Sequence, residues 1–278
     1  MFIKNETVQH GYESKGPQPD YLEEGTGPPV ILVHSSMGGA RQWGSLMPLL
    51  GGRWTVRAVN LFGYGGTPAW QDAAPPTLDD YAALVAAIVP PSAAPVVLVG
   101  HSLGGAVAMR AAQRLRGRVD RLVLLEPSLF GLLDAYGRPE AFHEILALAA
   151  RTTALVRAGE TDAAGEAFVD YWCGAGAWRV SPAGRRNAIA RLLPGLPGEW
   201  NAVLGKAPGL GDLRAFLPSR TLLVSFAGTT RPSRQVVEIL ADGCLHWDVV
   251  TIGEGGHMAP LTHPQRVNPM IQAFLAAS

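Results

Sequence analysis

Short apolar runs alternate with helical stretches along most of this chain, and this alternation limits its fold more than any other feature. Six mostly apolar runs lie between turn residues, at positions 30–33, 56–59, 96–99, 122–125, 221–224 and 247–250. Stretches with helical spacing of apolar residues lie at positions 78–89, 103–116, 232–240 and 267–276. Continuous apolar runs are typical of strands buried on both faces, and strands that alternate with helices form a mostly parallel sheet. The sequence therefore predicts an α/β fold with a doubly wound sheet.

One interval between strands is far longer than an ordinary connection. Residues 127–218 separate the run at 122–125 from the run at 221–224, whereas most connections take only a few residues. Apolar periodicity around 142–146 and 166–169, interrupted by Gly and Pro, predicts several short helices there. We expect residues 1–126 and 219–278 to form a core and residues 127–218 to form a helical cap. At the N-terminus, residues 6–14 and 20–24 are expected to form a leading hairpin.

Composition and charge exclude several classes of function. Lys plus Arg and Asp plus Glu both number 23, so no net field attracts the chain to nucleic acid or to an anionic membrane. Cys173 and Cys244 lack a metal-binding spacing, and we expect neither a metal nor a cofactor. The chain shows no signal peptide and no membrane span, which favours a cytoplasmic protein with a small, roughly neutral molecular partner. The sequence does not indicate an oligomeric state.

A Gly-x-Ser-x-Gly motif at residues 100–104 lies directly between a buried strand and an Ala-rich helix. The bare pattern is weak evidence in a chain with 33 glycines, but its position makes it informative. So sharp a turn requires Gly100 and Gly104, because backbone segments approach each other closely there. The turn is expected to point Ser102 away from the sheet as a nucleophile. It also places the Leu103 N–H at a helix N-terminus, where it can stabilise developing negative charge in an oxyanion hole.

The residues around this turn resemble the α/β-hydrolase family. Residues 33–39 are similar to the family's loop that supplies a second oxyanion N–H, a role that the resemblance assigns to Ser36, although Ser35 stands where Gly is usual. Residues 60–65 resemble a structural Asp-x-x-Gly-x-Gly turn of the family, with Asn60 in place of Asp. The resemblance implies an α/β-hydrolase fold whose cap is inserted after the strand that follows the nucleophile helix.

His257 is the predicted general base. It lies in a Gly-rich loop between the last expected strand and the final helix, from which an imidazole can reach Ser102. The family's chain order of nucleophile, acid and histidine also implies His257. His34 and His101 flank the site and are expected to form local hydrogen bonds instead.

The acid of the predicted catalytic triad is where the chain departs from the family. Members most often carry it after the strand that corresponds to 221–224, but residues 225–233 contain no Asp or Glu. Glu126 closes the strand at 122–125, which should neighbour the Ser102 strand, so its carboxylate should emerge at the same edge of the sheet. One branch of the haloalkane dehalogenases carries its acid at this place. We therefore predict Glu126 as the acid, with Asp248 and Asp242 as alternatives.

These residues predict a serine hydrolase that cleaves a small, mostly apolar ester through an acyl-enzyme intermediate. Ser102 argues against an epoxide hydrolase or a haloalkane dehalogenase, which would carry Asp there. Three alternatives stay open: a C–C bond hydrolase, a cofactor-free haloperoxidase-like enzyme, and a ligand-sensing receptor with little turnover. The apolar character of the substrate is inferred from aromatic residues in the expected cap, which are Phe130, Phe142, Phe168, Tyr171, Trp172, Trp178 and Trp200.

Overall fold

The computed structural model describes residues 18–91 and 94–277, which form a seven-stranded sheet in the order β1-β3-β2-β4-β5-β6-β7. The strands are β1 (Tyr21–Glu24), β2 (Pro29–Val33), β3 (Thr55–Val59), β4 (Val96–His101), β5 (Val119–Leu125), β6 (Thr221–Phe226) and β7 (Asp248–Ile252). Only β1, at one edge, runs antiparallel to its neighbour in this sheet. The predicted α/β class and mostly parallel sheet are confirmed.

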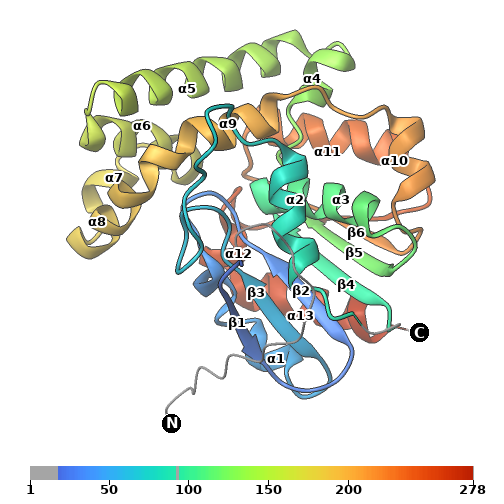
Figure 1. Cartoon of the computed structure of the whole chain (residues 1–278). Coiled ribbons are helices and arrows are strands. Elements are labelled where there is room, and N and C mark those ends of the chain that lie inside the picture. The colour runs from blue at the N-terminus through green and yellow to red at the C-terminus, as the bar shows by residue number, and fades with distance from the viewer. Residues whose placement is uncertain (1–17, 92–93, 278) are drawn as a thin grey trace.

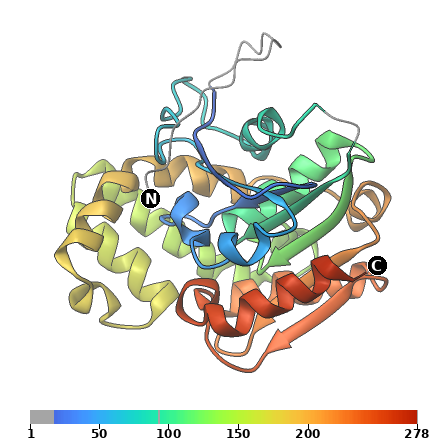
Figure 2. The same ribbon diagram turned by 90° about the horizontal axis from the view of Figure 1, so that it is seen from below.

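Helices pack on both faces of the sheet, as a doubly wound fold requires (Figures 1 and 2). One face is covered by α2 (Leu78–Ala87), α3 (Leu103–Leu115) and α11 (Arg231–Gly243). The other face is covered by the 3-10 helix η1 (Ala40–Trp43), α1 (Met47–Leu50), α12 (Ala259–Thr262) and α13 (Pro264–Ala276). The six strands and four helices predicted from apolar patterns between residues 30 and 276 are all present, with ends shifted by up to three residues.

Each central strand is apolar throughout because it supplies residues to two cores. In β5, Leu122 and Leu124 pack with α3, whereas Val123 and Leu125 pack with α13. Successive side chains of a strand point to opposite faces, so burial of both faces requires an unbroken apolar run. This two-sided burial explains why local sequence alone located the strands.

The N-terminal hairpin prediction is only partly tested. The expected second arm is present as β1, whose Leu22 lies opposite Ala58 of β3. The first arm, at residues 6–14, lies outside the described residues.

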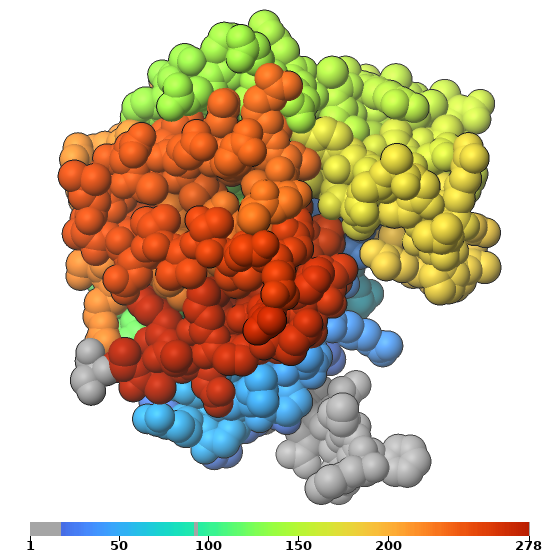
Figure 3. Space-filling view, turned by 180° about the vertical axis from the view of Figure 1, so that it is seen from behind, coloured from blue at the N-terminus to red at the C-terminus, as the bar shows by residue number. Residues whose placement is uncertain are grey.

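The segment between β5 and β6 is helical, as expected, and Figure 3 shows its green and yellow part along one edge of the molecule. It contains α4 (Gly131–Ala135), α5 (Pro139–Arg157), α6 (Thr161–Cys173), α7 (Ala177–Val180), α8 (Ala183–Leu192), the 3-10 helix η2 (Leu193–Gly195), α9 (Leu196–Leu204) and α10 (Leu210–Phe216). At 19 residues α5 is longer than the short helices predicted, because no Gly or Pro interrupts it after Pro139. That residues 127–218 are a separate cap domain stays a prediction.

Within residues 18–91 and 94–277, no helix has both the length and the apolar character that a bilayer span needs. No group of three or more His, Cys, Asp and Glu in the same residues is placed to hold a metal ion. Cys173 and Cys244 are both free thiols. Location in the cell stays a prediction.

Candidate active site

Ser102 occupies a strained turn between β4 and α3. Its φ is 57° and its ψ is −122°, a conformation that typically costs about 1–3 kcal/mol and is common at functional sites. A Cβ at Gly100 would lie 2.2 Å from the Gly104 carbonyl oxygen, and a Cβ at Gly104 would lie 2.2 Å from the Val33 carbonyl oxygen. Only glycine allows these approaches, so the two glycines bring the start of α3 against the end of β2.

The structure brings Ser102, His257 and Glu126 into one hydrogen-bonded row. Nε2 of His257 lies 2.9 Å from the Ser102 hydroxyl, and Nδ1 lies 2.8 Å from Oε2 of Glu126. All three side chains are buried, with exposed fractions of 6%, 2% and 0% in the order Ser102, His257, Glu126. A proton on Nδ1 would be donated to the carboxylate in this row, which would leave Nε2 unprotonated and facing the Ser102 hydroxyl.

Glu126 reaches His257 because β5 lies between β4 and β6. Its Oε1 accepts the Phe226 N–H at 2.8 Å, and its Oε2 accepts the Thr229 hydroxyl at 2.6 Å. The end of β6 and the turn after it contain no carboxylate, but they donate the hydrogen bonds that hold the carboxylate of Glu126, which follows β5. The side chain lies where the sequence placed it, at the same sheet edge as Ser102.

The alternative acids lie elsewhere. Asp248 is exposed at the first residue of β7, which is the opposite end of that strand from the His257 loop. Asp242 is exposed near the end of α11. Neither makes a hydrogen bond or ion pair with His257 among the described residues, in contrast to Glu126.

The loop after β2 borders the same site. Tyr64 OH accepts the Met37 N–H at 2.8 Å, and Oε1 of Gln42 accepts both the N–H and the hydroxyl of Ser35, at 3.0 and 2.7 Å. These bonds hold the residues on either side of Ser36. Ser36 and Leu103 line the same cavity as Ser102, and their role as oxyanion donors stays a prediction.

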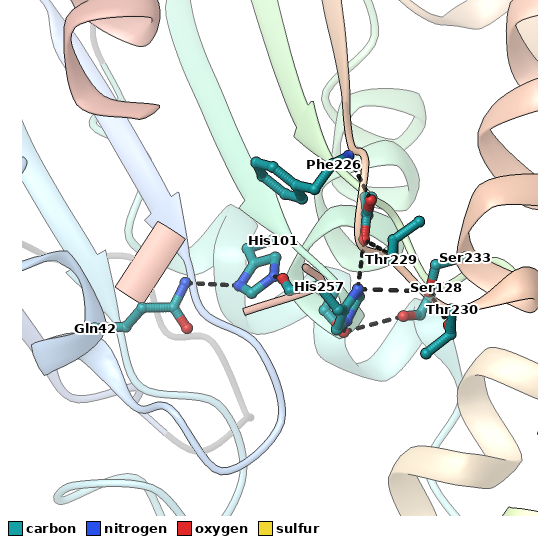
Figure 4. A network of polar contacts seen from close by, with 10 residues as sticks. Gln42, His101, Ser128, Phe226, Thr229, Thr230, Ser233 and His257 are labelled. Atoms are coloured by element: carbon teal, nitrogen blue, oxygen red, sulfur yellow. Dashed lines mark hydrogen bonds and ion pairs between the residues drawn. The ribbon is translucent and has the colours of Figure 1, made fainter. Parts of the chain in front are cut away.

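His34 and His101 form the local hydrogen bonds that the sequence suggested. Nδ1–H of His34 donates to the Ser35 carbonyl at 2.8 Å, and Nε2 accepts the Leu61 N–H at 3.1 Å. Burial lowers the pKa of His34 to about 4. Nε2–H of His101 donates to the His257 carbonyl at 2.8 Å, and burial likewise holds its pKa well below the usual value. His101 is therefore a neutral support for the His257 backbone (Figure 4).

An apolar cavity of about 160 Å³ opens at Ser102. This volume leaves room for on the order of ten water-sized groups, which suits a small molecule. Four of the seven aromatic residues named from the sequence line it: Phe130, Phe168, Trp172 and Trp200. The Trp172 ring also lies over His257, with centroids 4.3 Å apart. The helical segment and the sheet edge thus enclose the site together.

Sequence reasoning missed three polar residues of this site. Ser128 lies two residues beyond Glu126, and its hydroxyl is 3.0 Å from the Ser102 hydroxyl. Tyr64 and Glu199 are joined by a hydrogen bond of 2.7 Å from the phenol to the carboxyl. A signal for Glu199 was present, because it falls in phase with Leu196 and Val203 on the inward face of α9, where an apolar residue is expected.

Comparison with known proteins agrees with this fold. Residues 30–270 match a model of the Alpha/beta hydrolase family. A pimeloyl-[acyl-carrier protein] methyl ester esterase from Aromatoleum aromaticum is 38% identical over 108 residues, which cover 36% of this chain and 38% of that protein. The match thus spans only 38% of that relative's length.

Two further proteins are similar over most of the chain. A 2-hydroxymuconate semialdehyde hydrolase from a Pseudomonas species is 27% identical over 273 residues, which cover 91% of this chain and 89% of that protein. The solved structure of an enol-lactonase from Burkholderia xenovorans has a TM-score of 0.72 at 17% identity and covers 95% of this chain and 98% of that one. At that identity the likeness concerns the fold alone. Because the family model matches most of the chain and the sheet, turn and insertion agree with it, the chain belongs to the alpha/beta hydrolase family.

Proposed function

We propose that this protein is a serine hydrolase that cleaves small, mostly apolar esters through an acyl-enzyme intermediate. The observation that carries the proposal is the hydrogen-bonded row of Glu126, His257 and Ser102 at the floor of an apolar cavity. A serine hydroxyl is a weak nucleophile unless a neighbouring base accepts its proton, and this row supplies such a base.

The geometry supports the following sequence of steps. The Ser102 oxygen attacks the ester carbonyl while Nε2 of His257 takes the serine proton. The Glu126 carboxylate accepts Nδ1–H and balances the charge of the imidazolium that forms. The N–H groups of Ser36 and Leu103 bind the negative oxygen of the tetrahedral intermediate. His257 then protonates the leaving alcohol, and a water molecule attacks the acyl-enzyme through the same residues.

The substrate class follows from the cavity walls. Side chains such as Phe130, Leu196 and Val203 make the cavity mostly apolar, so a short acyl or alkyl group gains free energy by leaving water there. The partial match to a methyl ester esterase is consistent with an ester bond.

Active-site labelling tests the proposal. A fluorophosphonate should label Ser102 covalently, and Ser102→Ala should abolish both the labelling and the turnover of p-nitrophenyl esters. Ser128→Ala is the matched control and should keep the labelling at Ser102, because that hydroxyl lies 3.0 Å from Ser102 Oγ but bonds to no histidine among the described residues. Labelling at another residue, or turnover that survives in Ser102→Ala, would contradict the proposal.

A C–C bond hydrolase is the second candidate, since the 2-hydroxymuconate semialdehyde hydrolase is similar over 91% of the chain. The same purified protein should be offered a p-nitrophenyl ester and a vinylogous diketone in parallel. A kcat/KM that is at least about 100-fold higher for the diketone would favour this second function over the ester function. Tight binding of either compound with no turnover would instead favour a ligand-sensing receptor.

A further inference from the structure

Glu199 is a carboxyl group buried in the wall of the catalytic cavity. It lies on α9, and only 3% of the residue is exposed. Leu196 and Val203, on the same face of the helix, line the cavity beside it. A carboxyl at this depth loses much of its hydration, and a buried polar atom without a partner destabilises the folded protein.

The two oxygens of Glu199 have different surroundings. Oε1 accepts the Tyr64 hydroxyl at 2.7 Å, and the same Tyr64 oxygen accepts the Met37 N–H at 2.8 Å. Oε2 is fully buried and has no partner at hydrogen-bond distance among the described residues, although the Ser36 side chain lies near enough to the carboxyl to lower its pKa. Tyr64 therefore fixes one oxygen of the carboxyl beside the loop of Ser36, while the other oxygen lacks a hydrogen bond and has almost no surface open to the cavity.

The charges around the cavity limit what that molecule can be. Burial raises the pKa of Glu199, and contacts with the Ser36 and Tyr64 side chains only partly oppose the shift. Arg185 lines the same cavity, so a cationic substrate group would meet a like charge there. A substrate carboxylate would be repelled by ionised Glu199.

We propose that Oε2 of Glu199 binds a hydroxyl group of the substrate, so that the protein prefers hydroxy-substituted esters to unsubstituted ones. A hydroxyl suits this position because it donates to a carboxylate and accepts from a carboxylic acid. The inference rests on the proposed ester hydrolysis and narrows its substrate class. A small rotation of the Glu199 side chain brings Oε2 to the cavity surface, where such a substrate supplies the hydrogen bond that this oxygen lacks.

A ratio of rates tests this assignment. p-Nitrophenyl hexanoate is compared with its 3-hydroxy and 6-hydroxy derivatives, and the ratio of kcat/KM for hydroxy to unsubstituted ester is the readout. The wild-type ratio for the better derivative should be about tenfold or more, since the substrate hydroxyl provides a partner for a buried oxygen that otherwise has none. Glu199→Leu should bring the ratio to about one, and Glu199→Gln should retain part of it because an amide still bonds a hydroxyl.

Val203→Ala is the matched control, one helical turn from Glu199 on the same cavity wall. It removes apolar contact without a polar atom, so it should change the rates of both esters alike and leave the ratio as in the wild type. A wild-type ratio near one, or a ratio that Glu199→Leu leaves unchanged, overturns the inference. A 6-amino ester that reacts faster than the 6-hydroxy ester also overturns it.

Binding to Ser102→Ala separates this inference from the proposed function. Calorimetry measures the affinity of Ser102→Ala for the methyl esters of hexanoate and of the better hydroxy acid. This measurement needs no turnover, so it tests the role of Glu199 even if the wild-type protein hydrolyses no ester. An affinity preference for the hydroxy ester that Glu199→Leu removes supports the inference. Equal affinities for the two methyl esters overturn the inference about Glu199 but do not contradict ester hydrolysis by Ser102.

Discussion

Replacing Glu126 by Gln tests the predicted acid most directly. The carboxylate accepts three donors: the Phe226 N–H at 2.8 Å, the Thr229 hydroxyl at 2.6 Å and Nδ1–H of His257 at 2.8 Å. A glutamine of the same shape offers one oxygen and one NH₂ group in their place. If the oxygen stays on the Phe226 N–H, the NH₂ group faces His257.

That arrangement gives the imidazole the wrong tautomer. Nδ1 must then accept from the amide, so the proton moves to Nε2, which lies 2.9 Å from Ser102 Oγ and can no longer accept its proton. The reverse orientation of the amide sets its NH₂ group against the Phe226 N–H, which is also a donor. We expect kcat/KM to fall by about 10²- to 10⁴-fold, which corresponds to about 3–5 kcal/mol in activation free energy.

Steady-state hydrolysis of a p-nitrophenyl ester measures this fall, and the rate of fluorophosphonate labelling at Ser102 should fall with it. Circular dichroism should show that the fold is kept. Glu238→Gln is the control, because Glu238 is exposed and its nearest cation is Arg234 at 3.7 Å. If Glu126→Gln retained activity within about threefold of the wild type, the tautomer argument would be refuted.

Three further changes have defined outcomes. Ser128→Ala removes the hydroxyl that lies 3.0 Å from the Ser102 hydroxyl. It should lower kcat by about 3- to 10-fold, the effect of losing one neutral hydrogen bond, which stopped-flow assays can measure. An unchanged kcat would show that Ser128 does not contribute to catalysis. Burial lowers the pKa of His34 from 6.5 to about 4 in the folded protein, so the unfolded chain binds more protons between these two pH values. As the pH drops from 6.5 to 4, this group should therefore lower the free energy of unfolding by about 3 kcal/mol, which urea titrations measure. The pH slope should be shallower in His34→Asn, and an equal slope would contradict the assignment. Gly104→Ala would put a Cβ 2.2 Å from a backbone oxygen and should lower the free energy of unfolding, measured by thermal unfolding, by about 3 kcal/mol or more. Gly211→Ala is the control, because Gly211 in α10 has open space around it, and it should change the free energy of unfolding by no more than about 1 kcal/mol.

Local patterns determined most of the core. The aliphatic strands and amphipathic helices were readable because burial on both faces imposes an unbroken apolar run and packing on one face imposes a helical period. The turn at Ser102 was readable for a similar reason, since the strand, the glycines and the helix are contiguous in sequence. Glu126 followed from one further rule, that adjacent parallel strands end at the same sheet edge.

Which distant side chains meet depends on how the helices and loops pack in three dimensions. Tyr64 and Glu199 are 135 positions apart, and Glu126 and His257 are 131 apart. No local period relates such pairs, because their approach depends on how α9 and the loop after β7 pack over the sheet edge. Contiguous residues thus specify the strands, the helices and the nucleophile turn, whereas long-range packing specifies the cavity and the position of the buried Glu199 carboxyl.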